Sequence, residues 1–286
     1  MRAIGLAVLL AISAAGADPT FLRHSIARIA PHADDLTDGA SGVSYQPIFG
    51  ASDPQASQLK SVARYGLLTA APGGNSAVVS YPAEEQIYFV LDGAGTLIYG
   101  AEHAAIRAHD FAYLAPGVQH GIANSSGGPL HVMVMGFRIP AGVEIRPTPR
   151  LMLANADDVE PVTLAGHGPD CRFKLLMGTT ASRRDKLAAA SQMVSLFIMD
   201  FTPGGTNIPH HHEMDEEIYY ILRGKGEMVA GGGADGNEGR YPARQGDAYF
   251  IRLNATVGFY SGAKPGEEHD LVLAVRSRFP FSEPEP

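Results

Sequence analysis

The stretch that decides the fold of this chain is Pro209-His210-His211-His212-Glu213-Met214-Asp215-Glu216-Glu217. It lies within the spacing Gly204-x5-His210-x-His212-x4-Glu217-x6-Gly224. On a β-strand, residues two apart point to the same face, so the imidazoles of His210 and His212 are expected side by side. The four residues that follow form a turn, which brings Glu217 beside them on the next strand. Two neutral imidazoles and one carboxylate, here named the triad, form a facial site for a divalent metal.

The chain also contains an internal repeat with an offset of 131 residues, as from Val79 to His210. The segment Ile87 to Gly95 aligns without a gap with Ile218 to Gly226. The triad spacing resembles the first motif of the cupin superfamily, whose members place a metal inside a small β-barrel. Together, the resemblance and the repeat imply an all-β protein of two tandem cupin barrels, each a double-stranded β-helix or jelly roll.

Each copy consists of short β-branched or aromatic runs separated by Gly, Pro, Asn and Asp, which is typical of a sheet-rich barrel. The clearest predicted strands are Gln86 to Leu91, Ala112 to Ala115, His131 to Phe137, Met193 to Phe201, Ile218 to Leu222 and Leu271 to Val275. The best candidate for a short helix is Asp185 to Ser191.

The predicted segments are a signal peptide (1–17), an N-terminal arm (18–60), a first barrel (61–138), a connector with the start of the second barrel (139–192), and the second barrel (193–280). We expect the arm to pack on one barrel or on a partner subunit.

Only the second copy keeps the triad. In the first copy, the aligned positions hold Val79, Tyr81 and Gln86, which are poor metal ligands. The first copy instead has His120 where cupins place their last metal-binding histidine, while the second copy has Val257 there. We expect His120 to hydrogen-bond inside its own barrel.

The triad leaves an octahedral ion with three open positions, which suits one divalent Fe or Mn; Zn and Ni are also compatible. Other possible ligands in the same stretch are His211, Glu213 and Glu216. His211 has the opposite strand parity and should point outward. Glu216 aligns with Glu85 of the copy that lacks the triad, so the repeat favours Glu217 as the ligand.

Two further residues are candidates for catalysis. Tyr219 shares the strand parity of Glu217, so it can orient a substrate hydroxyl or act as a weak acid. Its counterpart Tyr88 lies in the copy without a site, which favours a packing role. Arg252 replaces a residue that cupins usually hold close to the pocket, where it can bind a substrate carboxylate. The alternative for Arg252 is a solvated surface position.

Composition limits the partners. The 286 residues are 45% hydrophobic and 18% charged, with a net charge of −8. This charge argues against nucleic acid or an anionic membrane as a partner. The partner that we expect is a small-molecule substrate. A homodimer through sheet edges or the arm is compatible with the sequence.

The N-terminus predicts export. Arg2 is a short basic region, Ala3 to Ala15 is apolar, and Ala15-Gly16-Ala17 supplies the small residues that a signal peptidase reads. We therefore expect cleavage after Ala17 and a mature protein that is secreted or periplasmic, without a membrane anchor. Cys171 is the single cysteine, so no intramolecular disulfide forms.

Three classes of function fit these features. The vacant metal positions favour a dioxygenase-type oxidoreductase that acts on a small polar substrate. The layout of a degenerate first barrel and a metal-type second barrel is similar to ureidoglycine aminohydrolase, a manganese-dependent hydrolase, which suggests hydrolase or lyase chemistry. In that family the ligands have the other strand parity, and His211 and Glu213 occupy those positions here. A non-catalytic barrel that binds a metal or a small ligand is the third class.

Overall fold

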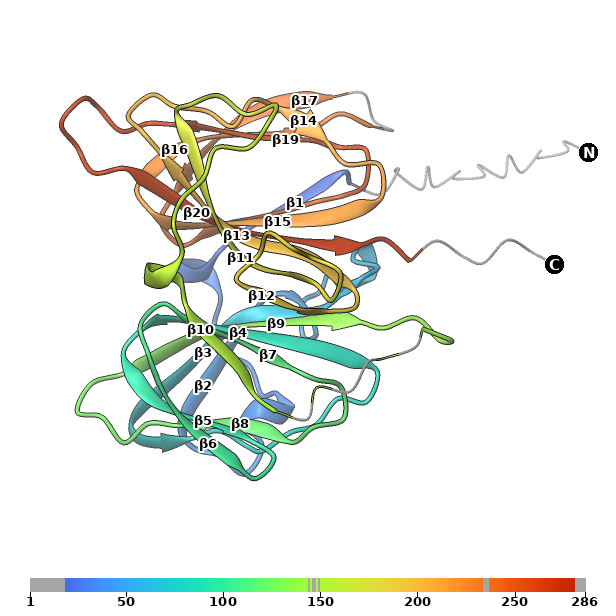
Figure 1. Cartoon of the computed structure of the whole chain (residues 1–286), viewed down its shortest axis with the longest axis vertical. Helices are drawn as coiled ribbons and strands as arrows, with labels where there is room; N and C mark the ends of the chain where they lie inside the picture. The colour runs from blue at the N-terminus through green and yellow to red at the C-terminus, as the bar shows by residue number, and fades with distance from the viewer. Residues whose placement is uncertain (1–18, 144, 146–147, 149, 234–236, 281–286) are drawn as a thin grey trace, which may run out of the picture.

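The chain folds into two β-barrels that are stacked along the long axis of the molecule (Figure 1). The computed structural model describes residues 19–143, 145, 148, 150–233 and 237–280. The predicted all-β class and the two tandem barrels are confirmed. The predicted signal peptide lies outside the described residues. Within the described ranges, no helix combines the length and the apolar character needed to cross a membrane.

The first barrel is built on one nine-stranded sheet. Its strands are β2 (Ser41–Gly50), β3 (Val62–Asn75), β4 (Glu84–Asp92), β5 (Ala94–Tyr99), β6 (Glu102–Arg107), β7 (Asp110–Leu114), β8 (His120–Ala123), β9 (Leu130–Arg138) and β10 (Met152–Asn155). Short 3-10 helices precede or connect strands along the chain. They are η1 (Ile26–Arg28), η2 (Asp35–Thr37), η3 (Ala56–Gln58) and η4 (Ala156–Asp158).

The second barrel pairs a seven-stranded sheet with a four-stranded one. The larger sheet contains β1 (Phe21–Ser25), β11 (Cys171–Thr179), β12 (Leu187–Ala190), β13 (Met193–Phe201), β15 (Asp215–Arg223), β18 (Asp247–Ile251) and β20 (Asp270–Arg278). The smaller sheet contains β14 (His210–His211), β16 (Lys225–Gly231), β17 (Glu238–Arg244) and β19 (Thr256–Ser261). The six strands predicted from the sequence correspond to β4, β7, β9, β13, β15 and β20.

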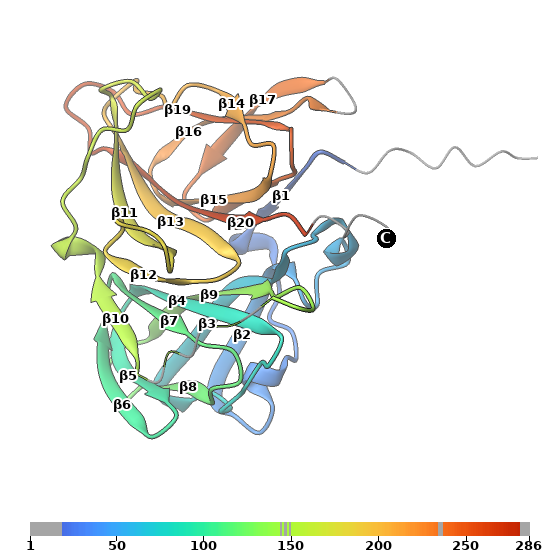
Figure 2. The same ribbon diagram turned by 45° about the vertical axis from the view of Figure 1, so that its right-hand side comes forward.

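The first strand of each repeat pairs with the barrel of the other repeat. β1, near the N-terminus, pairs with β18 of the second barrel, with Phe21 opposite Ile251. β10, at the start of the second repeat, pairs with β7 of the first barrel, with Met152 opposite Tyr113. β2 pairs with β3, so the segment expected as an arm contributes strands to both barrels (Figure 2).

Two buried carboxylates join the barrels in a reciprocal clasp. Glu85 on β4 accepts hydrogen bonds from three consecutive backbone N–H groups at the start of β13: Ser191 (2.7 Å), Gln192 (2.8 Å) and Met193 (2.5 Å). Its repeat counterpart Glu216 on β15 accepts from the backbone N–H of Lys60 (3.0 Å) and of Ser61 (2.8 Å), just before β3. Each carboxylate therefore satisfies backbone donors of the other barrel that would otherwise be buried without partners.

The predicted helix at Asp185 to Ser191 was wrong. Leu187 to Ala190 form β12, which pairs in parallel with β11. One or two turns of helix are unstable in isolation, and the edge of β11 offers backbone partners that a helix would not use. Tertiary pairing therefore outweighs the helix propensity of the alanines.

Candidate metal centre

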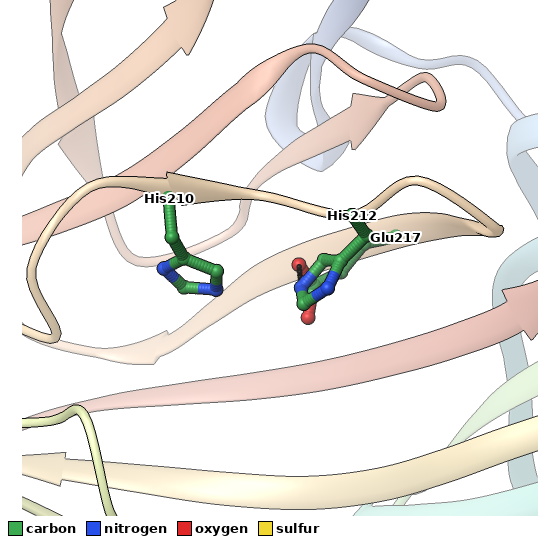
Figure 3. Close-up of side chains that lie close together, drawn as sticks. All are labelled: His210, His212 and Glu217. Atoms are coloured by element: carbon green, nitrogen blue, oxygen red, sulfur yellow. Dashed lines mark ion pairs between the residues drawn. The ribbon is translucent and has the colours of Figure 1, made fainter.

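The three side chains of the triad lie close together on two neighbouring segments of the second barrel (Figure 3). His210 belongs to β14, His212 follows on the same stretch, and Glu217 lies on β15 behind them. One potential ligand atom from each residue lies within 4.8 Å of the others. The side chain of Glu217 is only 2% exposed and that of His212 is 20% exposed. Among the described residues, the triad is the one group of three or more potential ligand residues that could hold a metal ion.

His210 is held in the tautomer that a metal needs. Its Nδ1 donates a hydrogen bond to the carbonyl oxygen of Ile208 at 2.8 Å, which leaves the lone pair of Nε2 free. Metal-bound histidines commonly donate their second ring N–H to a backbone carbonyl in this way. Burial lowers the pKa of His210, which favours the neutral imidazole that ligates metals.

The backbone is strained at the residue that supplies this carbonyl. Ile208 has a φ of 58°, a left-handed conformation that is unusual for a β-branched residue. Such a conformation costs of order 1–3 kcal/mol and is found most often at functional sites.

His212 and Glu217 present buried polar atoms that lack partners. His212 Nε2 lies 3.2 Å from Glu217 Oε2, and neither atom has a hydrogen-bond partner within the described part of the chain. A divalent cation would satisfy both atoms, so the donor set fits a metal. Arg276 Nη1 lies 3.4 Å from His212 Nδ1. A guanidinium only donates, so this contact requires Nδ1 to be the acceptor. A metal on Nε2 would place the ring proton on Nδ1, and the Arg276 donor would then be free for another acceptor.

The alternative ligands lie elsewhere. His211 and Glu213 face solvent, with side chains 57% and 79% exposed, and they approach each other at 4.0 Å. The outward direction predicted for His211 is confirmed. Glu216 is occupied by the clasp to the first barrel, on the opposite face of β15 from Glu217.

A cavity of about 400 Å³ opens beside the triad. Its lining combines apolar, aromatic, hydroxyl and basic side chains: Leu164, Ala165, His167, Phe173, Leu175, Arg184, Ser195, Phe197, Tyr219 and Arg276, with the triad. A larger cavity of about 780 Å³ is lined by residues of both barrels but contains none of the triad. We place the candidate site in the smaller cavity because it holds the metal-type donors.

Of the two predicted catalytic residues, the structure places one in this cavity. Tyr219 lines it and accepts a hydrogen bond from Asn207 Nδ2 at 2.8 Å. Burial, followed by the nearby Glu217 charge, raises the pKa of Tyr219 well above its usual value, so the hydroxyl stays protonated. Arg252 is not among the described residues that line the cavity, which favours the surface position named as its alternative. Arg184 and Arg276 are the arginines that do line it.

Sequence reasoning also missed His167, which belongs to the connector. Its ring lies 5.3 Å from the ring of His210, between centroids, and its Nδ1 donates to the carbonyl oxygen of Asn207 at 2.7 Å. Asn207 therefore holds both His167 and Tyr219 in the cavity. No spacing rule links a connector residue to a strand motif that lies some forty residues later. The only signal in the sequence was that this residue is a histidine.

The first barrel confirms the comparison between the two copies. Val79 lies opposite His120 there, whereas His210 lies opposite Val257 in the second barrel. The histidine and the valine have thus exchanged strands. His120 Nδ1 donates to the carbonyl oxygen of Val118 at 2.9 Å, in agreement with the hydrogen-bonding role expected for it.

Comparisons with known proteins agree with this architecture. Residues 66–136 and 197–261 each match the family model described as cupin domain. No curated protein matches the chain. Among solved structures, the chain is similar to the protein Ylba from E. coli, with 17% identity, coverage of 93% of this chain and 94% of that chain, and a TM-score of 0.68. The putative glyoxylate induced protein from Pseudomonas aeruginosa shows 18% identity, 93% and 92% coverage, and a TM-score of 0.70.

A mutant of Bacillus subtilis oxalate decarboxylase OxdC is a further structural neighbour, with 12% identity, coverage of 90% of this chain and 77% of that chain, and a TM-score of 0.65. At these identities the likeness concerns the fold alone.

Proposed function

Because this chain belongs to the cupin superfamily and carries two cupin domains in tandem, we propose that it is a metal-dependent enzyme acting on a small polar substrate. The observation that carries the proposal is the set of partnerless buried ligand atoms on His212 and Glu217, beside the free Nε2 of His210, at a cavity of about 400 Å³. A cavity of this size fits a small molecule.

The triad would hold one divalent ion, with Fe or Mn favoured. Bacillus subtilis oxalate decarboxylase, which shares the fold, has Mn(II) centres, and this supports the choice of Mn. When bound, such an ion supplies Lewis acidity and redox capacity. The protein itself orients His210 through the Ile208 carbonyl, provides a protonated hydroxyl at Tyr219 and lines the cavity with the apolar rings of Phe173 and Phe197.

We favour dioxygenase-type oxidation as the reaction class, because three protein ligands leave room at the metal for both a substrate and dioxygen. A redox-neutral hydrolase or lyase reaction is the second candidate. The presence of His167 in the cavity favours it, because a histidine beside the substrate can serve as a general acid or base.

The test is turnover by protein loaded separately with Fe(II), Mn(II) or Zn(II), with a panel of small hydroxy-, keto- and amino-acids. Oxygen uptake and product masses are recorded together, and a Glu217→Gln variant is the control. Turnover that consumes oxygen supports the first class, and turnover without oxygen supports the second. If no metal form converts any compound faster than the control variant, the enzyme proposal fails and a binding barrel is the better account.

We also propose that the protein is exported, on the basis of the apolar segment that precedes Asp18. The mass of the protein recovered from the periplasm tests this proposal. A mature chain that begins at Asp18 supports it, and a full-length chain in the cytoplasm contradicts it.

A further inference from the structure

We propose that Arg276 and Ser195 form a carboxylate-binding subsite, and that the substrate is therefore a small carboxylic acid. This inference rests on the proposed function, because it names the substrate class of the same cavity. The two residues are direct neighbours across β20 and β13, and both side chains line the cavity that contains the triad.

Both residues carry buried polar atoms that lack partners. Ser195 is only 1% exposed, and its Oγ has no hydrogen-bond partner among the described residues. Arg276 Nε is likewise buried and without a partner in the described part of the chain. A protein rarely leaves such donors unsatisfied, because each one costs free energy unless a ligand or ordered water accepts from it. Two of them side by side in one cavity indicate a ligand with acceptor oxygens.

Arg276 also makes only a long ion pair among the described residues, and Glu217, which lies opposite it on β15, belongs to the triad. The ion pair of Arg276 is with Asp215, with 4.0 Å between Nη1 and Oδ2. Its other contact is the 3.4 Å approach to His212 Nδ1, a neutral acceptor that a metal on Nε2 would remove. A guanidinium is always charged, and its planar set of donors matches a carboxylate.

The first barrel has an arginine in the corresponding cross-strand pair, and its partners show what such an arginine binds. The cross-strand pair that corresponds to Ser195 and Arg276 is Arg64 and Gly136, so the arginine has moved to the neighbouring strand. A Cβ on Gly136 would lie 2.6 Å from Arg64 Cγ, so glycine is what admits the arginine there. Arg64 Nη1 lies 2.9 Å from Asp35 Oδ1, and Arg64 Nε lies 3.3 Å from Glu84 Oε2. The arginine of the first barrel is thus satisfied by carboxylates of the protein.

The second barrel retains one of these two carboxylates and lacks the other. Asp215 is the repeat counterpart of Glu84. Asp35 comes from the segment that follows the bridge between His32 and Tyr45. In the second barrel, the segment that follows the corresponding bridge, between Val162 and Phe173, carries Leu164 and Ala165, which line the cavity and have no charge. The carboxylate that Asp35 provides in the first barrel therefore has no counterpart in this segment of the second. The second barrel does have Glu217 opposite Arg276, where the first has Gln86 opposite Gly136, but that carboxylate belongs to the triad. With Glu217 on the metal, the missing carboxylate is the one that a ligand would supply.

This placement also orients the substrate. With its carboxylate on Arg276 and Ser195, the rest of a small molecule extends toward the triad and the hydroxyl of Tyr219, which line the same cavity. Selectivity should follow charge: a carboxylate binds, and the neutral amide of the same shape does not, because it leaves the guanidinium without an anionic partner.

The test uses malonate, acetate and glycolate as probes, with malonamide, acetamide and glycolamide as their neutral counterparts. Binding is measured by isothermal titration calorimetry on wild-type protein and on the variants Arg276→Gln, Ser195→Ala and Arg252→Gln. Arg252 lies outside the cavity lining, so its variant is the matched control for loss of one arginine. Metal content is measured on every sample before titration, and both the metal-loaded and the metal-stripped forms are titrated.

We expect at least one carboxylate to bind wild-type protein, its amide to bind at least roughly tenfold more weakly, and Arg276→Gln to weaken binding by roughly tenfold to a hundredfold. Ser195→Ala should weaken it less, and Arg252→Gln should leave it unchanged, with equal metal content throughout. The subsite is refuted if no carboxylate binds either form, or if Arg276→Gln binds as the wild type does. If the protein takes up no metal on loading and still binds carboxylate through Arg276, the proposed function is contradicted and the subsite is supported.

Discussion

The clasp between the barrels predicts a large loss of stability from a single buried glutamate. Glu85 is fully buried, and it accepts three backbone N–H groups from the start of β13 and the hydroxyl of Tyr113 at 3.1 Å. In Glu85→Ala, these donors lose their acceptor in a site that solvent does not reach. A buried donor without a partner costs about 1–3 kcal/mol, and partial hydration of the new cavity offsets some of this cost, so we expect a loss of about 4 kcal/mol. The reciprocal Glu216→Ala removes fewer acceptor contacts and should cost about 3 kcal/mol.

Urea unfolding followed by tyrosine fluorescence and circular dichroism measures these losses. The matched control is Glu268→Ala, which removes an exposed glutamate whose ion pair with Arg223 is 3.7 Å long. A surface pair of this kind contributes about 0–1 kcal/mol. If Glu85→Ala and the control lose the same small amount, the clasp does not join the barrels as we infer. If the variant instead unfolds in two separate transitions, the carboxylate couples the barrels without determining the stability of each one.

Three other predictions concern local chemistry. Ile208→Gly should stabilise the protein by about 1 kcal/mol in urea unfolding, because glycine adopts the observed φ of 58° without strain; a loss of stability would contradict the strain. Burial and a side-chain hydrogen bond with Asp35 raise the pKa of Asp34 to about 6, so its favourable contribution is complete below pH 4 and is lost as pH rises through 6. The melting temperature of Asp34→Asn should therefore improve relative to wild type between pH 4.5 and 7, whereas a constant difference would refute the shift. Burial also raises the pKa of Cys171 to about 12, so the native thiol should not react with a thiol reagent at pH 8 and should react once urea unfolds the chain; rapid native labelling would overturn this.

Local spacing was sufficient to predict the triad. The alternation of a strand determines that His210 and His212 share a face, and one tight turn returns the chain to Glu217. The same parity placed Tyr219 in the cavity and His211 outside it, and both positions are found. The repeat identified the barrel without a triad, because Val79 and His120 align with positions that pair in the same way in the second barrel.

Long-range pairing was beyond the reach of the sequence. Arg276 meets the triad because β20 pairs with β15, where Arg276 lies opposite Glu217, and no local pattern reports that register. Arg252 was chosen because it replaces a residue that cupins usually hold close to the pocket, and that position alone does not show whether the side chain reaches the cavity. The exchange of β1 and β10 between the barrels was missed for the same reason, since the pairing partner of an edge strand depends on tertiary contacts.

The strongest test of the account is the metal content of the untagged protein, measured by plasma mass spectrometry beside two sets of variants. One set removes the triad: His210→Ala, His212→Ala and Glu217→Gln. The other set removes the exposed neighbours in the same stretch: His211→Ala and Glu213→Ala. We expect about one divalent ion per chain in the wild type and in the second set, and loss of the ion in the first set. Equal metal content in all variants, or loss through His211 and Glu213 instead, would contradict the assignment of His210, His212 and Glu217 as the metal centre.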